Sequence, residues 1–358
     1  NSVDIYLKVK EGNKFYFRNI DWVGNTKYSN DFLTEKLGIK PGEIYSQQIL
    51  TERLQFSQNN SDISSLYLDD GYLSFSATPV EVLVQNDSID FEIRLREGKQ
   101  YRVNNIIIKG NTKTNDRIIR RTIRTRPGEL FSRSDVVRTQ RELAQLGYFN
   151  PEKFGINPIQ NPSDGTVDIE YTLEEKPSDQ VELSGGWGAG RVVGTLGLRF
   201  TNFSIRNLFN GEHWDPLPSG DGQQFSIRAQ SNGAFYQAYS MSFVEPWLGG
   251  KKPNSFSVSL SHSVQTNGLP RKITVDGDKI TNPDRAYLKI SGVSVGLGKQ
   301  LKVPDDYFSL YQSVSYQYYD LYNFGNIFTF DKGFSNNVSY TMSFGRNSVS
   351  QPIFPRYG

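Results

Sequence analysis

Hydrophobic and polar residues alternate along most of the second half of the chain, for example from Phe256 to Ser261. A period of two is the pattern of a β-strand whose two faces meet different surroundings. Strands of roughly ten residues fit a tilted span across a membrane. The sixth predicted strand is the least regular, because its apolar face changes near Ser291. The predicted strands lie near residues 180–189, 191–201, 223–232, 235–245, 255–265, 286–299, 307–320 and 334–346.

The polar face of these strands is made of small, mostly uncharged residues. A soluble β-sandwich would place Lys, Glu and Thr on its wet face, whereas a wide, water-filled lumen accepts Ser, Gln, Asn and Gly. Aromatic residues near strand ends, Trp247 and Tyr318 among them, are typical of the girdles at membrane interfaces. We therefore expect an antiparallel transmembrane β-barrel, with a soluble β-domain as the less favoured alternative.

The first half of the chain contains an internal repeat. Residues 24–27 (Gly-Asn-Thr-Lys) return at 110–113, and residues 41–43 (Pro-Gly-Glu) return at 127–129 in the same register. A strand-like segment at 90–98 has counterparts at 4–12 and at 168–176. Matches this long at one spacing predict a repeated module.

Each module is predicted to be α+β, in the order strand, helix, helix, strand, strand. In the second copy we expect strands at 101–108, 154–160 and 167–173, with Asn115 or Asp116 capping the first helix and Ser134 the second. The first copy is predicted to have a longer second helix at 47–69 and later strands at 78–85 and 89–95.

Composition narrows the classes of protein further. The net charge is +2, apolar residues make up 36% and aromatic residues 13%, and there are 32 Gly. No run of about 18 apolar residues exists, so the sequence has no transmembrane helix. The absence of Cys excludes disulfides and thiolate metal sites. Residue 1 is Asn, inside a strand-like run without a signal segment, so we expect the chain to begin after a removed or omitted part.

Gly-Asn-Thr after the first strand, together with residues 146–149 (Leu-Gly-Tyr-Phe) closing the second helix, makes each module resemble a POTRA domain. A generic small α+β module is the alternative. POTRA modules that lead into a barrel resemble the BamA-like family of outer-membrane β-barrel assembly factors. Residues 185–188 (Gly-Gly-Trp-Gly), 202–209 and 245–248 (Glu-Pro-Trp-Leu) carry this resemblance, which covers essentially the whole chain.

The resemblance implies that the chain is a fragment. We expect residues 1–12 to be the last strand of a preceding POTRA module, 13–98 a POTRA module, 99–177 the final one, and 178–358 the N-terminal half of the barrel. The family's barrel has about sixteen strands, so the eight predicted here would be the first half. Three POTRA copies disfavour the two-partner secretion transporters, which carry two, and a BamA-like factor is preferred to the family's translocation assembly factors. Residues 211–222 are longer than the family's usual turn.

The function that this resemblance implies is folding and insertion of β-barrel proteins in the outer membrane of a Gram-negative cell. The POTRA modules would then lie in the periplasm. Expected partners are unfolded outer-membrane protein clients, accessory lipoproteins and outer-membrane lipid, with no nucleic acid. A POTRA-containing outer-membrane transporter or pore is the alternative, and a scaffold that binds lipoproteins is a weaker one.

Two kinds of strand edge are the candidate binding sites, because unpaired backbone groups can accept a client strand. The first barrel strand is the expected seam for client strands, and its glycines would make it easy to open, although they could merely relieve crowding. The seam candidates are Val181, Leu183, Gly185, Gly186, Trp187, Gly188 and Gly190. The candidate POTRA edge residues are Thr78, Val80, Val82, Val84, Phe154, Ile156 and Ile159.

The sequence contains no pattern that predicts a catalytic or metal-binding site. His213 and His262 have no ligand or carboxylate at metal-binding spacing. Residues 186–190 resemble a phosphate-binding loop, but Val193 stands where its last glycine should be, and no helix is predicted to follow. We therefore expect no enzyme activity, no cofactor and no metal.

Overall fold

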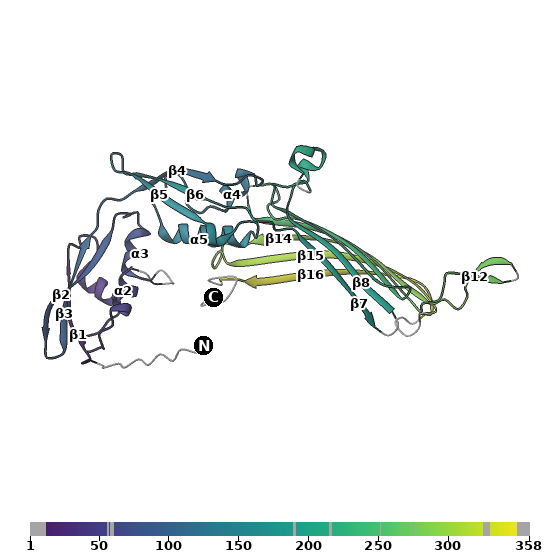
Figure 1. The fold of residues 1–358 in the computed structure, drawn as a ribbon, viewed down its shortest axis with the longest axis horizontal. Coiled ribbons are helices and arrows are strands. Elements are labelled where there is room, and N and C mark those ends of the chain that lie inside the picture. The colour runs from purple at the N-terminus through teal and green to yellow at the C-terminus, as the bar shows by residue number, and fades with distance from the viewer. Residues whose placement is uncertain are drawn as a thin grey trace, which may run out of the picture. The chain divides into compact units, whose positions relative to one another are not determined.

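The computed structural model describes residues 12–55, 57, 61–188, 191–214, 217–250, 252–275, 277–324 and 330–348 (Figure 1). The predicted strand at 1–12 lies outside these residues except for Gly12. Two units emerge. The first comprises residues 1–109, 123–142 and 154–172, and the second comprises 110–122, 143–153 and 173–358. Each is described by itself.

The first unit begins with a complete α+β module. It contains β1 (Tyr16–Val23), α1 (Asn30–Leu37), α2 (Gln47–Gln55), α3 (Ile63–Leu68), β2 (Ser76–Gln85) and β3 (Ser88–Arg96). β3 is the central strand, parallel to β1 and antiparallel to β2. Apolar residues from the helices and the sheet form one buried core, with Leu33, Leu54, Tyr67 and Ile93 all at 0% exposure.

The second helical segment of this module is not one helix over 47–69, as predicted, but two. α2 ends at Gln55, and α3 begins after Asp62, whose carboxylate accepts a hydrogen bond from the backbone N–H of Ser65 at 3.1 Å. A carboxylate at an N-cap satisfies an amide that has no partner within the helix, so Asp62 starts a new helix instead of continuing the old one.

The second module repeats the plan with β4 (Arg102–Lys109), α4 (Asp116–Thr122), α5 (Arg133–Gln145), the 3-10 turn η1 (Pro151–Lys153), β5 (Gly155–Asn161) and β6 (Thr166–Thr172). β6 lies between β4, to which it is parallel, and β5, to which it is antiparallel. α5 begins earlier than predicted. Ser132, rather than Ser134, caps it by accepting the N–H of Asp135 at 3.2 Å, and the Ser134 hydroxyl instead donates to Asp69 at 2.6 Å. Among the described residues, no helix has the length and apolar character needed to cross a membrane.

The repeated Gly-Asn-Thr has a physical explanation. Gly24 and Gly110 both have φ +89°, in the left-handed region that favours glycine. A Cβ at either position would overlap a backbone carbonyl oxygen, that of Leu95 or that of Leu173. The turn therefore requires glycine for its conformation and for its close approach to the neighbouring strand.

The second unit contains one antiparallel sheet of eight long strands, as predicted (Figure 1). Its order follows the sequence, with the first strand β7 at one edge and β16 at the other. The strands are β7 (Gln180–Gly188), β8 (Arg191–Phe203), β9 (Gln223–Asn232), β10 (Tyr236–Glu245), β11 (Asn254–Thr266), β14 (Tyr287–Gln300), β15 (Phe308–Tyr322) and β16 (Lys332–Arg346). A small hairpin, β12 (Lys272–Val275) and β13 (Asp278–Thr281), extends from the loop between β11 and β14 and was not predicted.

Register places unlike residues on the two faces of this sheet. Apolar partners cross from strand to strand on one face: Leu198, Ile227, Met241, Leu260, Val293, Tyr316 and Val338. The row next to it, on the opposite face, is all serine from β9 onward: Ser226, Ser242, Ser259, Ser294, Ser315 and Ser339. Hydroxyls within that row are bonded at 2.7 Å (Ser226 and Ser242) and 2.8 Å (Ser315 to Ser294). The sheet therefore has one apolar and one polar, uncharged row along its middle, the arrangement that suits lipid on one side and water on the other.

Candidate functional site

The first barrel strand has an edge with no partner among the described strands. β7 pairs with β8 alone, so the backbone groups on its other side are not bonded within the sheet. Its alternate side chains are strongly exposed, with Leu183 at 82% and Trp187 at 75%. Val181 and Leu183, which register opposite Leu198 and Leu196, continue the apolar face. Of the predicted seam residues, 181–188 lie in this strand, and Gly190 lies outside the described residues.

The seam glycines do not relieve crowding by any described residue. A Cβ at Gly186 would meet no atom within 4 Å, and one at Gly185 would meet only the Val193 carbonyl oxygen, at an ordinary 3.8 Å. Glycines of β14 behave differently, since a Cβ at Gly292 would come within 2.8 Å of the Ser261 hydroxyl. Among the described residues, crowding accounts for glycine in β14 and is not seen at Gly185 or Gly186 in β7. What Gly185 and Gly186 do is remove side-chain packing from the edge strand, which makes strand pairing weaker.

The two POTRA sheets also end in open strands, because β2 and β5 lie at the edges of their sheets. Thr78, Val80, Val82 and Val84 are in β2, and Ile156 and Ile159 are in β5. Phe154 was predicted to be in this strand but precedes it by one residue. The distal part of β2 is apolar and exposed over Val82, Leu83 and Val84, which is an unusual surface for an edge strand.

Each of these edges is interrupted. Pro79 lies inside β2 and Pro158 lies inside β5, and proline has no N–H to donate. In β2 the pairing with β3 also shifts between Glu81 and Leu83, so Val82 forms a bulge. Only short stretches of continuous backbone donors and acceptors are left on either edge.

A different site, not foreseen from the sequence, lies in the second unit where the turn between β8 and β9 meets the segment 110–122. Asp221, 4% exposed, is at its centre. Its carboxylate accepts hydrogen bonds from the Asn115 amide at 2.9 Å, the Arg117 guanidinium at 3.1 Å and the Ser204 hydroxyl at 2.7 Å. One buried carboxylate thereby joins the POTRA helix α4 to both ends of a barrel turn. We call Asp221 and these three partners the junction.

Backbone contacts surround the junction. The N–H of Asn115 donates to the Gly220 carbonyl at 2.9 Å, and the Asn202 amide donates to Thr114 Oγ1 at 2.9 Å. Gly220 has φ +120°, and a Cβ there would be 2.7 Å from the Lys113 carbonyl oxygen. The turn can approach the backbone of Lys113 this closely only with glycine at position 220.

The next barrel turn also reaches α4. The Arg121 guanidinium lies over the Trp247 ring, 5.0 Å from its centroid, which is a cation–π contact. Burial lowers the pKa of Arg121. The preceding Glu245 accepts the Trp247 N–H and the Gln223 side-chain amide, both at 2.8 Å. Residues 202–209 and 245–248, singled out for their resemblance alone, are therefore part of the attachment between barrel and POTRA module.

The sequence contained a local signal for the junction, namely the run Gly220-Asp221-Gly222 with an acid between two glycines. It did not show which donors the acid would meet. Asn115 and Arg117 are more than a hundred residues away in the chain and reach Asp221 only through the fold.

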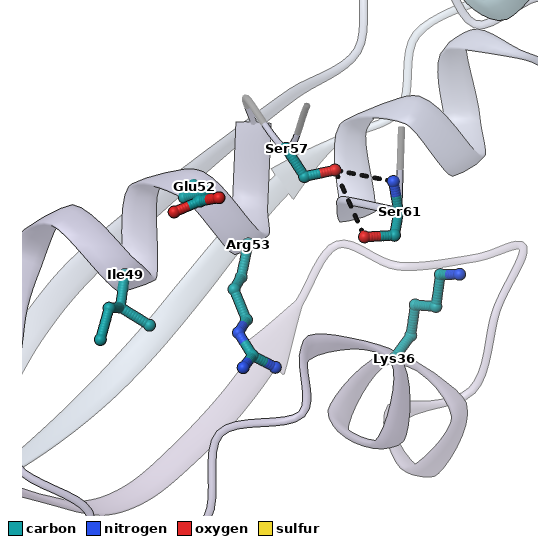
Figure 2. A pocket seen from close by; sticks show the side chains of 6 residues that line it. All are labelled: Lys36, Ile49, Glu52, Arg53, Ser57 and Ser61. Atoms are coloured by element: carbon teal, nitrogen blue, oxygen red, sulfur yellow. Dashed lines mark hydrogen bonds between the residues drawn. The ribbon is translucent and has the colours of Figure 1, made fainter. Parts of the chain in front are cut away.

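A cavity of about 440 Å³ lies between the helices of the first module, lined by Lys36, Ile49, Glu52, Arg53, Ser57 and Ser61 (Figure 2). Arg53 points between the helices and donates to the carbonyl oxygens of Leu37 at 2.9 Å and Gly38 at 3.1 Å. It therefore supplies hydrogen bonds to the C-terminal end of α1 and is already used in the fold. Ser57, which also lines the cavity, donates its hydroxyl to the Asp62 carboxylate at 3.0 Å, and that carboxylate is already used as the N-cap of α3.

His262 forms no catalytic or metal-binding group with the described residues. His262 Nδ1 is bonded to the Ser291 hydroxyl at 2.9 Å across the sheet, which explains the change of the apolar face at Ser291. The side chain of His213 lies outside the described residues. In the part of the chain that the structure describes, no cluster of three His, Asp or Glu side chains could hold a metal ion.

Glu175 is a carboxylate at the end of the second module that is held by several hydrogen bonds. Its carboxylate accepts hydrogen bonds from Thr112 Oγ1 at 2.8 Å and from the N–H groups of Lys113 and Thr114 at 2.8 and 2.7 Å. Burial alone would raise the pKa of Glu175, but these hydrogen bonds outweigh it and the pKa is lowered. A lowered pKa in the folded state adds stability above the ordinary Glu pKa, and this is lost as the pH falls through the folded pKa.

We therefore expect the urea concentration at the unfolding midpoint of the second module to decrease as the pH is lowered from about 5 to about 3. Glu175→Gln should remove most of this pH dependence and lower the stability at neutral pH. Pulse proteolysis of the full-length protein in urea measures this. Glu174→Gln is the matched control, because Glu174 is half-exposed and pairs with Lys153 on the surface. If Glu175→Gln retained the acid dependence of the unmodified protein, the hydrogen bonds to Glu175 would not be its cause.

Comparison with known proteins agrees with this architecture. The POTRA family model, described as a surface antigen variable number repeat, matches residues 15–98 and 101–176, and the Omp85 superfamily domain matches residues 219–358. The crystal structure of BamA from Haemophilus ducreyi lacking POTRA domains 1–3 superposes with a TM-score of 0.62 at 18% identity, covering 97% of this chain and 62% of that one. The chain is a partial BamA-like protein.

Curated relatives carry the same description. The outer membrane protein assembly factor BamA of Neisseria meningitidis is 28% identical over 270 residues, which is 75% of the BamA-like chain and 31% of that protein. A putative outer membrane protein assembly factor of Treponema pallidum is 26% identical over 285 residues, 76% of this chain and 32% of the relative. The BamA-like chain therefore spans about a third of the length of these relatives.

Proposed function

We propose that the full-length protein of which this BamA-like chain is part folds and inserts β-barrel proteins in the outer membrane, with its POTRA modules in the periplasm. One observation carries the proposal: the first strand of the barrel sheet pairs with β8 alone among the described strands, continues the apolar face, and contains glycines that no described residue crowds. Such an edge can pair with an incoming strand and release it again. Unfolded outer-membrane proteins are the clients, and accessory lipoproteins are further partners.

The POTRA edges β2 and β5 would act earlier than β7. Backbone pairing along these edges does not depend on the client's sequence, and the apolar residues Val82, Leu83 and Val84 would cover one part of an unfolded strand. The interruptions at Pro79, Val82 and Pro158 restrict each contact to a few residues. The POTRA modules are therefore proposed to hold clients weakly and the barrel edge to complete their pairing.

The test is stimulated folding of a model barrel client by the full-length protein in proteoliposomes, followed by the mobility shift of the folded client on unheated gels. We expect folding to be faster than in empty vesicles of the same lipid. A transporter or pore is the second candidate, because the serine row would line a water-filled lumen. High, steady ion conductance in planar bilayers without client folding would favour the pore and reject the assembly function.

The proposed role of β7 can be tested by substituting its glycines. Replacing both Gly185 and Gly186 with valine should leave the fold intact, because both Cβ atoms have room, but should strengthen the edge strand by about 1–2 kcal/mol. If opening of β7 limits client exchange, client folding should slow by roughly 5-fold to 30-fold. The measurement is the client-folding rate in proteoliposomes.

Gly345→Val on β16 is the matched control, since a Cβ there meets only the Ser309 hydroxyl, at 3.9 Å. This variant should fold clients at the unmodified rate. Equal rates for all three proteins would reject β7 as the seam while leaving the assembly function itself untouched.

A further inference from the structure

The turn between β8 and β9 presents an apolar surface that the described residues leave uncovered. Ile205, Leu208 and Phe209 are all exposed, and Phe209 has 95% of its surface accessible. Leu208 follows Ile205 by three positions across the 3-10 turn η2 (Arg206–Phe209), so these two side chains lie on the same side of it, and Phe209 is the next residue. In Figure 1 this teal-green turn stands clear of the strand ends.

Hydrogen bonds within the turn stabilise its conformation. The Asn207 N–H donates to the Ser204 hydroxyl at 3.3 Å and its side-chain amide to the Ser219 carbonyl at 3.0 Å. The Trp214 indole N–H donates to the Asn207 carbonyl at 3.2 Å, across the turn. These hydrogen bonds fix the backbone of the turn in which the exposed Phe209 lies. A grouped, braced apolar surface of this kind marks a contact site.

The surface continues the apolar face of the sheet. β8 ends at Phe203, whose ring stacks on Phe225 at 5.1 Å between centroids and meets Phe243 edge-on at 6.5 Å. Phe225 and Phe243 are register partners on the same face as Ile227 and Met241. The exposed turn therefore begins where the apolar face of the barrel ends.

Two further turns at this end of the sheet have the same composition. Leu248 in the turn between β10 and β11 is 46% exposed, and Val303 in the turn between β14 and β15 is 80% exposed. Each is close in sequence to an exposed cation, Lys252 or Lys302, as Phe209 is to Arg206. None of the ion pairs among the described residues includes these three cations.

We propose that these three turns form an anchoring rim, consisting of Phe209, Leu248 and Val303 with Arg206, Lys252 and Lys302, which binds the phospholipid leaflet at the POTRA end of the barrel. The apolar side chains enter the region below the headgroups, and the cations bind the phosphates of anionic lipids. Aromatic and aliphatic residues flanked by Arg or Lys are the composition that suits this boundary. The inference rests on the proposed insertion of the sheet into a membrane.

The first experiment measures the depth of Phe209. The 358 residues contain no cysteine. With any cysteine in the rest of the full-length protein replaced by serine, Phe209→Cys can carry an environment-sensitive fluorophore in proteoliposomes of phosphatidylethanolamine and phosphatidylglycerol. We expect a blue-shifted emission and quenching by lipids with a spin label near the headgroup. Quenching should be several-fold stronger than at Ile280→Cys, an exposed position of the β12–β13 hairpin.

A second label at Leu260→Cys, on the apolar face of β11, distinguishes failure of the rim proposal from failure of the proposed membrane insertion. If the label at 260 is quenched by lipid and the label at 209 is not, the rim is overturned and the membrane insertion stands. If neither is quenched, the proposed insertion of the sheet fails as well.

The second experiment tests the cations. The spectrum of spin-labelled phosphatidylglycerol should show several-fold preferential association over spin-labelled phosphatidylethanolamine. In the triple variant Arg206→Gln, Lys252→Gln, Lys302→Gln this preference should fall toward parity, while quenching at position 209 persists. A preference that is unchanged in the triple variant would overturn the role of the cations in binding anionic lipid.

Discussion

Gly110→Ala should destabilise the second POTRA module by roughly 3 kcal/mol or more. Two costs combine. An alanine at φ +89° would be held in the left-handed region, which costs about 1–2 kcal/mol, and its Cβ would overlap the Leu173 carbonyl oxygen. A backbone atom inside a strand cannot move away as the end of a flexible side chain can, so the turn or the strand must shift.

Gly128→Ala is the matched control, because Gly128 also has φ +89° but a Cβ there would meet nothing within 4 Å. It should cost only the conformational part, about 1–2 kcal/mol. Pulse proteolysis of the full-length protein in urea gives both midpoints. Equal losses for the two variants would show that overlap with Leu173 contributes nothing. Gly24→Ala should repeat the large effect in the first module, because Leu95 takes the place of Leu173 there.

Asp221→Ala should release the barrel turns from α4, at a cost of about 2–4 kcal/mol. The substitution removes a nearly buried carboxylate and leaves the Asn115, Arg117 and Ser204 donors without their acceptor. Arg117 is half-exposed and can turn to water, so the loss is smaller than for a fully buried ion pair. Hydrogen exchange should become faster at residues 113–122 and 203–223, while the strands β10 to β15 keep their protection.

Asp116→Ala tests whether the charge on α4 matters in general. Asp116 pairs with Arg120 four residues on, and both side chains are about half-exposed, so its removal should cost no more than about 0.5 kcal/mol. In the client-folding assay, Asp221→Ala should slow folding if attachment of the last POTRA module to the barrel is used for client transfer. Unchanged exchange at 113–122 in Asp221→Ala would mean that the junction does not hold the turn to α4.

Local patterns were sufficient to predict most of the fold. Period-two alternation located all eight barrel strands to within a few residues, because side chains on opposite faces of a strand meet opposite solvents. Two of the missed features had local signals that were not used. Asp62 before Ile63 marked a helix start inside the supposed helix 47–69, and Gly277 next to Asp278 marked the turn of the β12–β13 hairpin.

The junction could not be predicted in this way. Asp221 owes its burial to donors from three segments, and no periodicity reports which segments meet. The edges of the sheets are an intermediate case. Pro79 and Pro158 indicate an edge position from sequence alone, since a central strand cannot spare the N–H. Whether an edge can bind a client depends on how many consecutive backbone donors and acceptors it leaves open. The sequence alone does not give that number.

The interrupted POTRA edges bear on how long a client stays bound. With Pro79 and the bulge at Val82 in β2, and Pro158 in β5, an added strand finds few consecutive hydrogen bonds on either module. At about 1 kcal/mol net for each hydrogen bond, a contact of three or four bonds dissociates quickly. Residence times would then be short, and a client would move from one edge to the next many times before committing. If clients bind as proposed, the interruptions that make these contacts brief also keep the modules from pairing edge to edge with one another.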